Sequence, residues 1–486
     1  MIGWLYTLTV LGIAVFGLHM ALLLLLAWLA RRRRPVPARV DGTSCAPWPR
    51  VLVQIPLYNE RTVVERVIAA AAALDYPRER LLIQILDDST DETGPLARAL
   101  TSRWAAAGAP IAYVHRRDRS GFKAGALAAG LALAREAEYV AIFDADFVPP
   151  PDILKRWLAA FMEQPQLGLV QGRWEHLNGA ANWVAQAQTL MFDSYFAVDQ
   201  VARSASGLLM NFNGSAGMWR RACIDDAGGW QGDTLAEDLD LSYRAQINGW
   251  RLAYRAEISA PAELPTSLMA FRQQQFRWAQ GSFQVFRKLG APLLRARLGW
   301  PRKVLGVLHI LGYLPHVLLV LSLGLSLPLA ALGGFAPVHW GALSWLAVVP
   351  FVVAAWGQWA LAPARGETRW RALGRMWVFP FLTLTFLGLA WSTTVAFIGA
   401  LAGRGRAFER TPKRGDGTAA YSVRTDRFLG EFALAIYAAF AGWLALQRVP
   451  ELAPVLFLYA TSFGLTVVLG LLEQRGTGRQ SRAESA

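Results

Sequence analysis

Two aspartates one residue apart end an apolar run in the first third of the chain. Residues 139–144 read YVAIFD, and Asp146 follows after a single alanine. In an extended chain alternate side chains point the same way, so Asp144 and Asp146 can reach one divalent cation or one end of a polar ligand. For an isolated triplet a solvated turn after a strand is the preferred reading, so the rest of the sequence has to supply the evidence for a site.

The segments that must position these aspartates follow a repeated pattern. Apolar runs typical of strands alternate with stretches of helical periodicity, and such alternation predicts a mostly parallel sheet with right-handed crossovers. In sheets of this kind ligands bind beyond the carboxyl ends of the strands. The expected strands are 51–57, 81–86, 111–115 and 139–144, and the expected helices are 60–74, 92–107 and 122–135.

Polar side chains follow each of these four strands. Helix capping explains any one of them, but four successive strand ends with such groups point to one site. Lys123 stands at the start of an expected helix, where its charge and the free amides suit a phosphate. The residues, in order of the strands, are Tyr58 and Glu60, then Asp87 and Asp88, then Lys123, then Asp144 and Asp146.

Three further motifs lie downstream. A glycine-containing segment, FNGSAGMWR at 212–220, includes Asn213, Gly214 and Ser215. An acidic pair, Glu237 and Asp238, follows, and then QQFRW at 274–278. Each motif also has an ordinary explanation. The glycine-containing segment could be a tight turn, the acidic pair could be the favourable first turn of a helix, and QQFRW could belong to an amphipathic helix. Their order along one chain makes coincidence improbable.

Together these motifs resemble the family-2 inverting glycosyltransferases with a GT-A (Rossmann-like) fold, and especially the cellulose-synthase-like mannan and glucan synthases. The resemblance implies that Tyr58, Glu60, Asp87, Asp88, Lys123, Asp144, Gln274 and Arg277 bind a nucleotide sugar. It also implies that Asp144 and Asp146 hold Mg²⁺ or Mn²⁺ on the donor diphosphate.

The same resemblance also implies which residues bind the acceptor and activate its hydroxyl group. Asp238 would be the general base that takes the proton of the acceptor hydroxyl. The acceptor would contact Trp278, whose indole suits a sugar ring, together with Asn213, Gly214, Ser215 and Glu237. The chain departs from the family's Thr-Glu-Asp motif at Ala236, which replaces the threonine.

Composition indicates a membrane protein. Hydrophobic residues make up 54% of the 486 residues and charged residues only 17%, with the long apolar runs near the N-terminus and from 303 onward. The formal net charge is +14. Because the arginines concentrate beside the apolar runs, the positive-inside rule explains this charge better than a nucleic-acid partner. With only Cys45 and Cys223 present, a structural disulfide or a zinc site is not expected.

The expected organisation is an α/β GT-A cytosolic domain joined to an α-helical transmembrane bundle. Five crossings are predicted, with 376–402 forming an interfacial or re-entrant pair that breaks near 391–394, because basic segments flank it on both sides. The divisions are 1–34, a transmembrane helix and basic flank; 45–295, the GT-A domain; 303–362, two transmembrane helices; 363–427, cytosolic and interfacial segments; 428–473, a transmembrane hairpin; and 474–486, a cytosolic tail.

The segment Phe408–Lys413 resembles the gating loop of cellulose-synthase-like enzymes, in which Thr411 and Lys413 would contact the donor diphosphate. The whole pattern predicts an inner- or plasma-membrane enzyme that polymerises sugar from UDP-glucose or GDP-mannose into a β-linked polysaccharide and exports it. The alternative is a ceramide-glucosyltransferase-like enzyme that adds one sugar to a lipid acceptor. A membrane scaffold or transporter subunit with a vestigial catalytic domain is a third reading, against which the intact residues argue: Asp88, Asp144, Asp146, Asp238 and Arg277.

Overall fold

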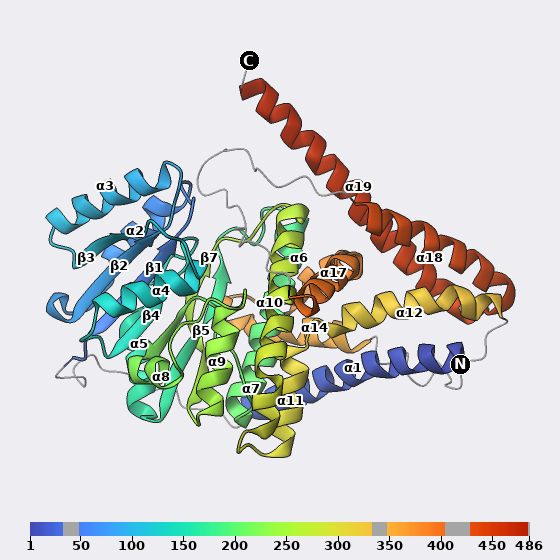
Figure 1. Ribbon diagram of the computed structural model, residues 1–486, viewed down its shortest axis with the longest axis horizontal. Helices are drawn as coiled ribbons and strands as arrows, with labels where there is room; N and C mark the ends of the chain where they lie inside the picture. The colour runs from blue at the N-terminus through green and yellow to red at the C-terminus, as the bar shows by residue number, and fades with distance from the viewer. Residues whose placement is uncertain (33–47, 333–347, 404–427, 485–486) are drawn as a thin grey trace.

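The computed structural model describes residues 1–32, 48–332, 348–403 and 428–484, with side chains described up to Arg475. An α/β domain lies on one side, and long apolar helices extend from the other side (Figure 1). The helix that carries Gln274, Arg277 and Trp278 stands between the two parts. This is the predicted combination of a GT-A-like domain with a bundle of apolar helices.

A mixed sheet forms the centre of the α/β domain. Its strand order is β3-β2-β1-β4-β6-β5-β7. The first four strands in the chain pair in parallel, as predicted, whereas β6 runs antiparallel to both β4 and β5. The strands are β1 (Val51–Leu57), β2 (Leu81–Asp87), β3 (Ile111–His115), β4 (Tyr139–Ile142), β5 (Leu167–His176), β6 (Gly217–Arg220) and β7 (Arg251–Ala262).

Two glutamines interrupt the apolar strands β1 and β2, and their amides find partners inside the core. Gln54 Nε2 donates to Gln84 Oε1 at 3.1 Å and to the carbonyl of Leu127, while Gln84 Nε2 donates to the carbonyl of Gly130. A Cβ at Gly130 would lie 2.6 Å from both glutamine side chains. The buried amides therefore fix how the helix that contains Gly130 lies on the sheet.

Helices cover both faces of this sheet and bury an apolar core on each. One core contains Val67 and Trp157 and the other contains Leu127 and Trp219. The helices of the domain are α2 (Val64–Ala72), α3 (Thr93–Ala106), α4 (Phe122–Leu133), α5 (Ile153–Glu163), α6 (Trp183–Ser194), the π-helix η2 (Tyr195–Gln200), α7 (Val201–Ser206), α8 (Arg221–Asp226), α9 (Glu237–Ile247) and α10 (Leu268–Arg295), with the short 3₁₀ turn η1 (Arg78–Arg80) before β2.

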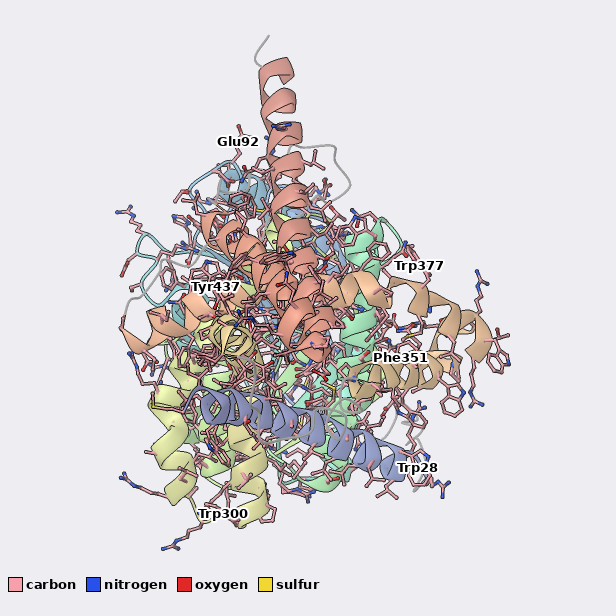
Figure 2. All side chains as sticks on the ribbon, turned by 90° about the vertical axis from the view of Figure 1, so that its right-hand side faces the viewer. Trp28, Glu92, Trp300, Phe351, Trp377 and Tyr437 are labelled. Atoms are coloured by element: carbon pink, nitrogen blue, oxygen red, sulfur yellow. The ribbon has the colours of Figure 1, made fainter. Side chains whose placement is uncertain are left out.

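The second part of the chain is helical throughout the residues described. Its elements are α11 (Trp300–Ile310), α12 (Leu314–Ala331), α14 (Val349–Leu361), η4 (Pro363–Arg365), α15 (Arg369–Leu373), η5 (Gly374–Val378), α16 (Phe379–Gly388), α17 (Ala390–Leu401), α18 (Leu429–Arg448), η6 (Pro450–Leu452) and α19 (Ala453–Glu484), together with α1 (Ile2–Arg32) from the N-terminus. Exposed aromatic side chains such as Phe351 and Trp377 lie together on one side of this part (Figure 2).

Five helical segments are long and apolar enough to cross a membrane: Ile2–Arg32, Leu314–Ala331, Arg369–Leu401, Leu429–Arg448 and Pro450–Arg475. The number equals the predicted one, but the membership differs. The described part of the expected crossing at 341–362 is the 13-residue helix α14, whereas Arg369–Leu401 was expected not to cross.

The Arg369–Leu401 segment contains two consecutive helices, α16 and α17. A turn at Leu389 separates α16 from α17, two residues before the expected break. Helix α16 packs mainly beside α19 and also beside α6, whereas α17 packs beside α10 and α12. The segment therefore contacts both the α/β domain and the apolar helices α12 and α19.

We expect a cysteine introduced at Ala402, in a chain without Cys45 and Cys223, to react with a membrane-impermeant maleimide from the same side as a cysteine at Ala364, which precedes the segment. Both positions are exposed. Intact cells and inverted vesicles provide the two sides for the measurement. Labelling of the two positions from opposite sides would mean that the 376–402 segment crosses the membrane.

Candidate active site

A cavity of about 170 Å³ opens beyond the carboxyl ends of the central strands. It gathers residues from every motif of the sequence that lies within the described ranges. The predicted residues that line it are Tyr58, Glu60, Asp88, Lys123, Asp144, Asp146, Asn213, Gly214, Glu237, Asp238, Gln274, Arg277 and Trp278. Thr411 and Lys413 lie outside the described residues.

Two predicted contact residues lie behind the cavity wall instead of on it. Asp87 is fully buried, and its carboxylate accepts hydrogen bonds from Tyr113 Oη at 2.6 Å and from the amide of Ser89. Ser215 is also buried, and its hydroxyl accepts a hydrogen bond from the amide of Asp144 at 2.9 Å. The predicted direct contacts of Asp87 and Ser215 with ligand are therefore corrected: both residues support the loops that carry Asp88 and Asp144.

The loop after β3 contributes arginines that the sequence reading did not select. Arg116 forms a bidentate pair with Asp88, with Nε 2.8 Å from Oδ1 and Nη2 2.5 Å from Oδ2. The guanidinium of Arg119 lies over the ring of Tyr58, 3.2 Å from its centroid, and both residues line the cavity. The sequence feature that could have indicated these arginines is the basic run at 116–119, because an anionic ligand needs cations near it.

Lys123 is the cation at the centre of the acidic groups. Its ammonium donates to Asp144 Oδ1 at 2.5 Å and to the carbonyl of Gly214 at 2.8 Å, and it lies 3.8 Å from Glu237 Oε1. Burial alone would lower the pKa of Lys123, but the charges of Asp144 and Glu237 outweigh it and raise this pKa above its usual value. The side chain therefore stays protonated beside the carboxylates.

Asp238 occupies the first turn of α9 and faces the cavity. Burial, followed by the negative charge of Glu237, raises the pKa of Asp238 to about 7, although Lys123 and the amide of Leu239 partly oppose this shift. The Leu239 amide donates to Asp238 Oδ1 at 2.7 Å, which leaves Oδ2 for a ligand. A carboxylate with a pKa near neutrality is suited to accept a proton from a hydroxyl group during a reaction.

Gly214 allows these groups to approach each other. Its φ angle is +80°, and a Cβ built there would lie 2.9 Å from Asp238 Oδ2 and 3.4 Å from Lys123 Nζ. Any other residue would carry the strain of a left-handed backbone and would also press on the two side chains that face the cavity.

We expect Gly214→Ala to lower turnover at least tenfold, because displacing a reacting group by about 1 Å can cost on the order of 10²-fold. Gly207→Ala is the matched control, since Gly207 also has a positive φ angle, +63°, but no atom lies within 4 Å of its Cβ position. Turnover per folded molecule is the measurement. Equal activity of the two variants would contradict the steric explanation.

The carboxylates Asp144 and Asp146 fit a hard divalent cation. Both line the cavity, and carboxylate oxygens are the ligands preferred by Mg²⁺ and Mn²⁺. Within the described residues, no group of three or more His, Cys, Asp or Glu side chains is arranged to hold a metal ion. Mg²⁺ that binds together with substrate phosphates takes one or two protein carboxylates and completes its shell with phosphate oxygens and water.

An aromatic wall bounds the other side of the cavity. Trp278 on α10 lies edge-on to Phe192, with ring centroids 6.0 Å apart, and Trp174 packs against Phe192. All three residues line the cavity. Trp174 and Phe192 come from β5 and α6 and belong to no motif, so only the tertiary structure identifies them. Flat aromatic faces of this kind are suited to sugar rings.

Comparison with known proteins identifies the class to which this site belongs. Residues 49–281 match the sequence model of the family described as "Glycosyltransferase like family 2". They therefore form a family-2 glycosyltransferase domain, as the motifs predicted. The sheet and its covering helices are the GT-A-like fold expected of such a domain.

The curated relatives give a narrower resemblance. The chain is 43% identical over 256 residues to "Probable glucomannan 4-beta-mannosyltransferase 7" of Oryza sativa subsp. japonica, covering 51% of this chain and 43% of that protein. It is 43% identical over 251 residues to "Glucomannan 4-beta-mannosyltransferase 2" of Arabidopsis thaliana, covering 51% and 47%. The chain thus matches less than half the length of these two relatives.

Among solved structures, the chain is similar to "Mannosyltransferase PcManGT from Pyrobaculum calidifontis in complex with GDP-Man and Mn2+". The sequences are 23% identical, the match covers 82% of this chain and 98% of that one, and the TM-score is 0.49.

Proposed function

We propose that this protein is a membrane-embedded, inverting hexosyltransferase that extends a β-linked glycan from a nucleotide sugar. The observation that carries the proposal is the meeting of Asp238, Lys123 and the Asp144–Asp146 pair in one cavity. The names of the relatives favour mannose as the transferred sugar and a 1,4 linkage, and hence GDP-mannose over UDP-glucose as the donor.

The geometry supports a single displacement. Asp238 accepts the proton of the acceptor hydroxyl as that oxygen attacks the anomeric carbon, and the bond to the nucleotide diphosphate breaks on the opposite face. An α-linked donor then gives a β-linked product. Lys123 and Arg277 line the cavity as cations and would stabilise the negative charge that develops on the leaving diphosphate. When bound by Asp144 and Asp146, Mg²⁺ or Mn²⁺ would neutralise further charge on the diphosphate.

The pKa of Asp238 gives this mechanism a pH dependence. Only the ionised carboxylate can accept a proton, so with a pKa of about 7 the competent fraction falls as the pH drops below neutrality. We expect kcat/KM of the free enzyme to fall about tenfold per pH unit on the acid side and to level off above about pH 7. Donor binding measured over the same range provides the control. A flat profile between about pH 5.5 and 7.5 would exclude Asp238 as the titrating base.

The aromatic wall formed by Trp278, Trp174 and Phe192 supports a glycan acceptor, and the long apolar helices beside α10 offer a route through the membrane for a growing chain. We therefore propose that the catalytic domain faces the cytosol and that the polymer is exported. A gating role for Thr411 and Lys413 belongs to the same proposal. The alternative is a glycolipid synthase, in which the acceptor is a lipid and only one sugar is added.

Incubation of the purified full chain with individual radiolabelled nucleotide sugars tests the proposal. We expect incorporation from GDP-mannose into a product of high molecular mass that an endo-β-1,4-mannanase degrades. A product that is fully lipid-extractable and carries one sugar would establish the glycolipid alternative. No transfer from any donor, with the fold intact, would support the vestigial scaffold.

A further inference from the structure

We propose that the C-terminal hairpin of α18 and α19 positions the catalytic helix α10 through two glutamates, Glu473 and Glu431. The proposal rests on the proposed function, because its consequence is an effect on sugar transfer. These glutamates do not line the cavity. They would be positioning residues that act through α10.

Glu473 of α19 caps the N-terminus of α10. Its Oε1 accepts the amide of Leu268 at 2.8 Å, and its Oε2 accepts the amide of Met269 at 3.1 Å and the hydroxyl of Ser267 at 2.8 Å. The next two amides are satisfied within the helix itself, by Ser267 Oγ and the Ser267 carbonyl. A helix begins with four amides that lack helical partners, and here two of them depend on a residue about 200 positions away in the chain.

Glu431 of α18 holds the following turn of the same helix. Arg272 Nη2 donates to Glu431 Oε1 at 2.7 Å, and both side chains are at least nine-tenths buried. The guanidinium of Arg272 also lies over the ring of Phe428, 5.3 Å from its centroid. A buried charge is costly without its partner, so this pair fixes α18 against α10 at one register.

The cavity residues of α10 follow directly after these contacts. Gln274, Arg277 and Trp278 lie within about three turns of Glu473's contacts, a distance of roughly 8 to 15 Å along the helix axis. A shift of α10 at its N-terminus would therefore move all three side chains.

The same helix also reaches the general base. A Cβ at Gly281 of α10 would lie 2.8 Å from the Cβ of Ala236, and the amide of Leu235 donates to Gln284 Oε1 at 2.8 Å. Leu235 and Ala236 directly precede Glu237 and Asp238 in the chain. The hairpin thus has a continuous path of contacts through α10 to both the aromatic wall and the base.

The test compares Glu473→Ala, Glu473→Gln and Glu431→Gln in the full chain, reconstituted in lipid nanodiscs. Glu451→Gln is the matched control, because it removes an exposed carboxylate at the other end of the same hairpin. We expect kcat per folded molecule to fall about 10- to 100-fold in Glu473→Ala and less in Glu473→Gln, which keeps one acceptor oxygen. The control should match the wild type.

Hydrogen exchange measured by mass spectrometry gives a readout that needs no transfer activity. We expect faster exchange of the amides of Leu268 and Met269 in both Glu473 variants and not in Glu451→Gln. Unchanged exchange would overturn the capping role. A lower melting temperature with kcat and KM per folded molecule unchanged would reduce the glutamates to structural residues and overturn the positioning role. If the wild type transfers no sugar, the proposed function fails, whereas the exchange experiment still decides whether the hairpin holds α10.

Discussion

Replacing Asp238 by asparagine is expected to reduce sugar transfer by about 10² to 10⁴-fold, the range that general-base catalysis typically contributes. Asparagine has nearly the same shape as aspartate, and its side-chain oxygen can still accept the hydrogen bond from the amide of Leu239. It cannot take up a proton near neutral pH. Single-turnover kinetics with saturating donor would isolate the chemical step.

Donor binding should change little in this variant, because Asp238 faces the acceptor in the proposed mechanism. Asp225→Asn is the matched control: Asp225 is exposed on α8 and pairs with Arg221 at the surface. We expect the control to retain wild-type turnover. If Asp238→Asn also turns over at the wild-type rate, another group must be the base.

Removing the divalent cation should abolish transfer, and Asp146→Ala should weaken metal-dependent nucleotide binding at least about 100-fold. Loss of a residue that only orients a metal ligand already costs roughly 10- to 100-fold in metal affinity, so loss of a carboxylate ligand should cost more. Asp146 is nearly buried at the cavity wall, so a water molecule alone would replace it poorly. The measurement is the nucleotide affinity with and without Mn²⁺, obtained by calorimetric titration.

The control for this experiment is Asp152→Ala. Asp152 precedes α5, is exposed, and its side chain makes no capping hydrogen bond to that helix. Chelation by EDTA and restoration with Mg²⁺ or Mn²⁺ should reproduce the Asp146→Ala effect in the wild type and reverse it. Equal nucleotide affinity of the wild type in EDTA and in Mn²⁺ would show that the Asp144–Asp146 pair holds no functional metal.

The sequence alone predicts the class of domain and half of the residues that line its cavity. Strands buried on both faces leave a strong apolar signal, and the groups at their carboxyl ends must meet at one edge of a parallel sheet. That reasoning located Asp88, Lys123, Asp144 and Asp146 without coordinates. Motif order then added Asp238 and the QxxRW segment, whose residues come from elements later in the chain.

The fold decides which neighbour of a paired motif lines the cavity. Asp87 and Asp88 read alike in the sequence, but side chains alternate along an extended chain, so only Asp88 lines the cavity while Asp87 supports β2 and β3 from within. The antiparallel strand β6 and the aromatic wall from β5 and α6 were also decided there. The residues of β6 and of the aromatic wall show no local sequence pattern that predicts which residues they will pack against.

The role of the C-terminal hairpin could be found only from the structure. Glu473 is one acidic residue near a basic tail, and nothing in its local sequence indicates that it caps a helix that begins at Leu268. Local sequence determines periodicity, turn chemistry and strand burial, because these depend on near neighbours. Contacts between residues about 200 positions apart depend on how whole helices pack, and packing is a property of the complete fold.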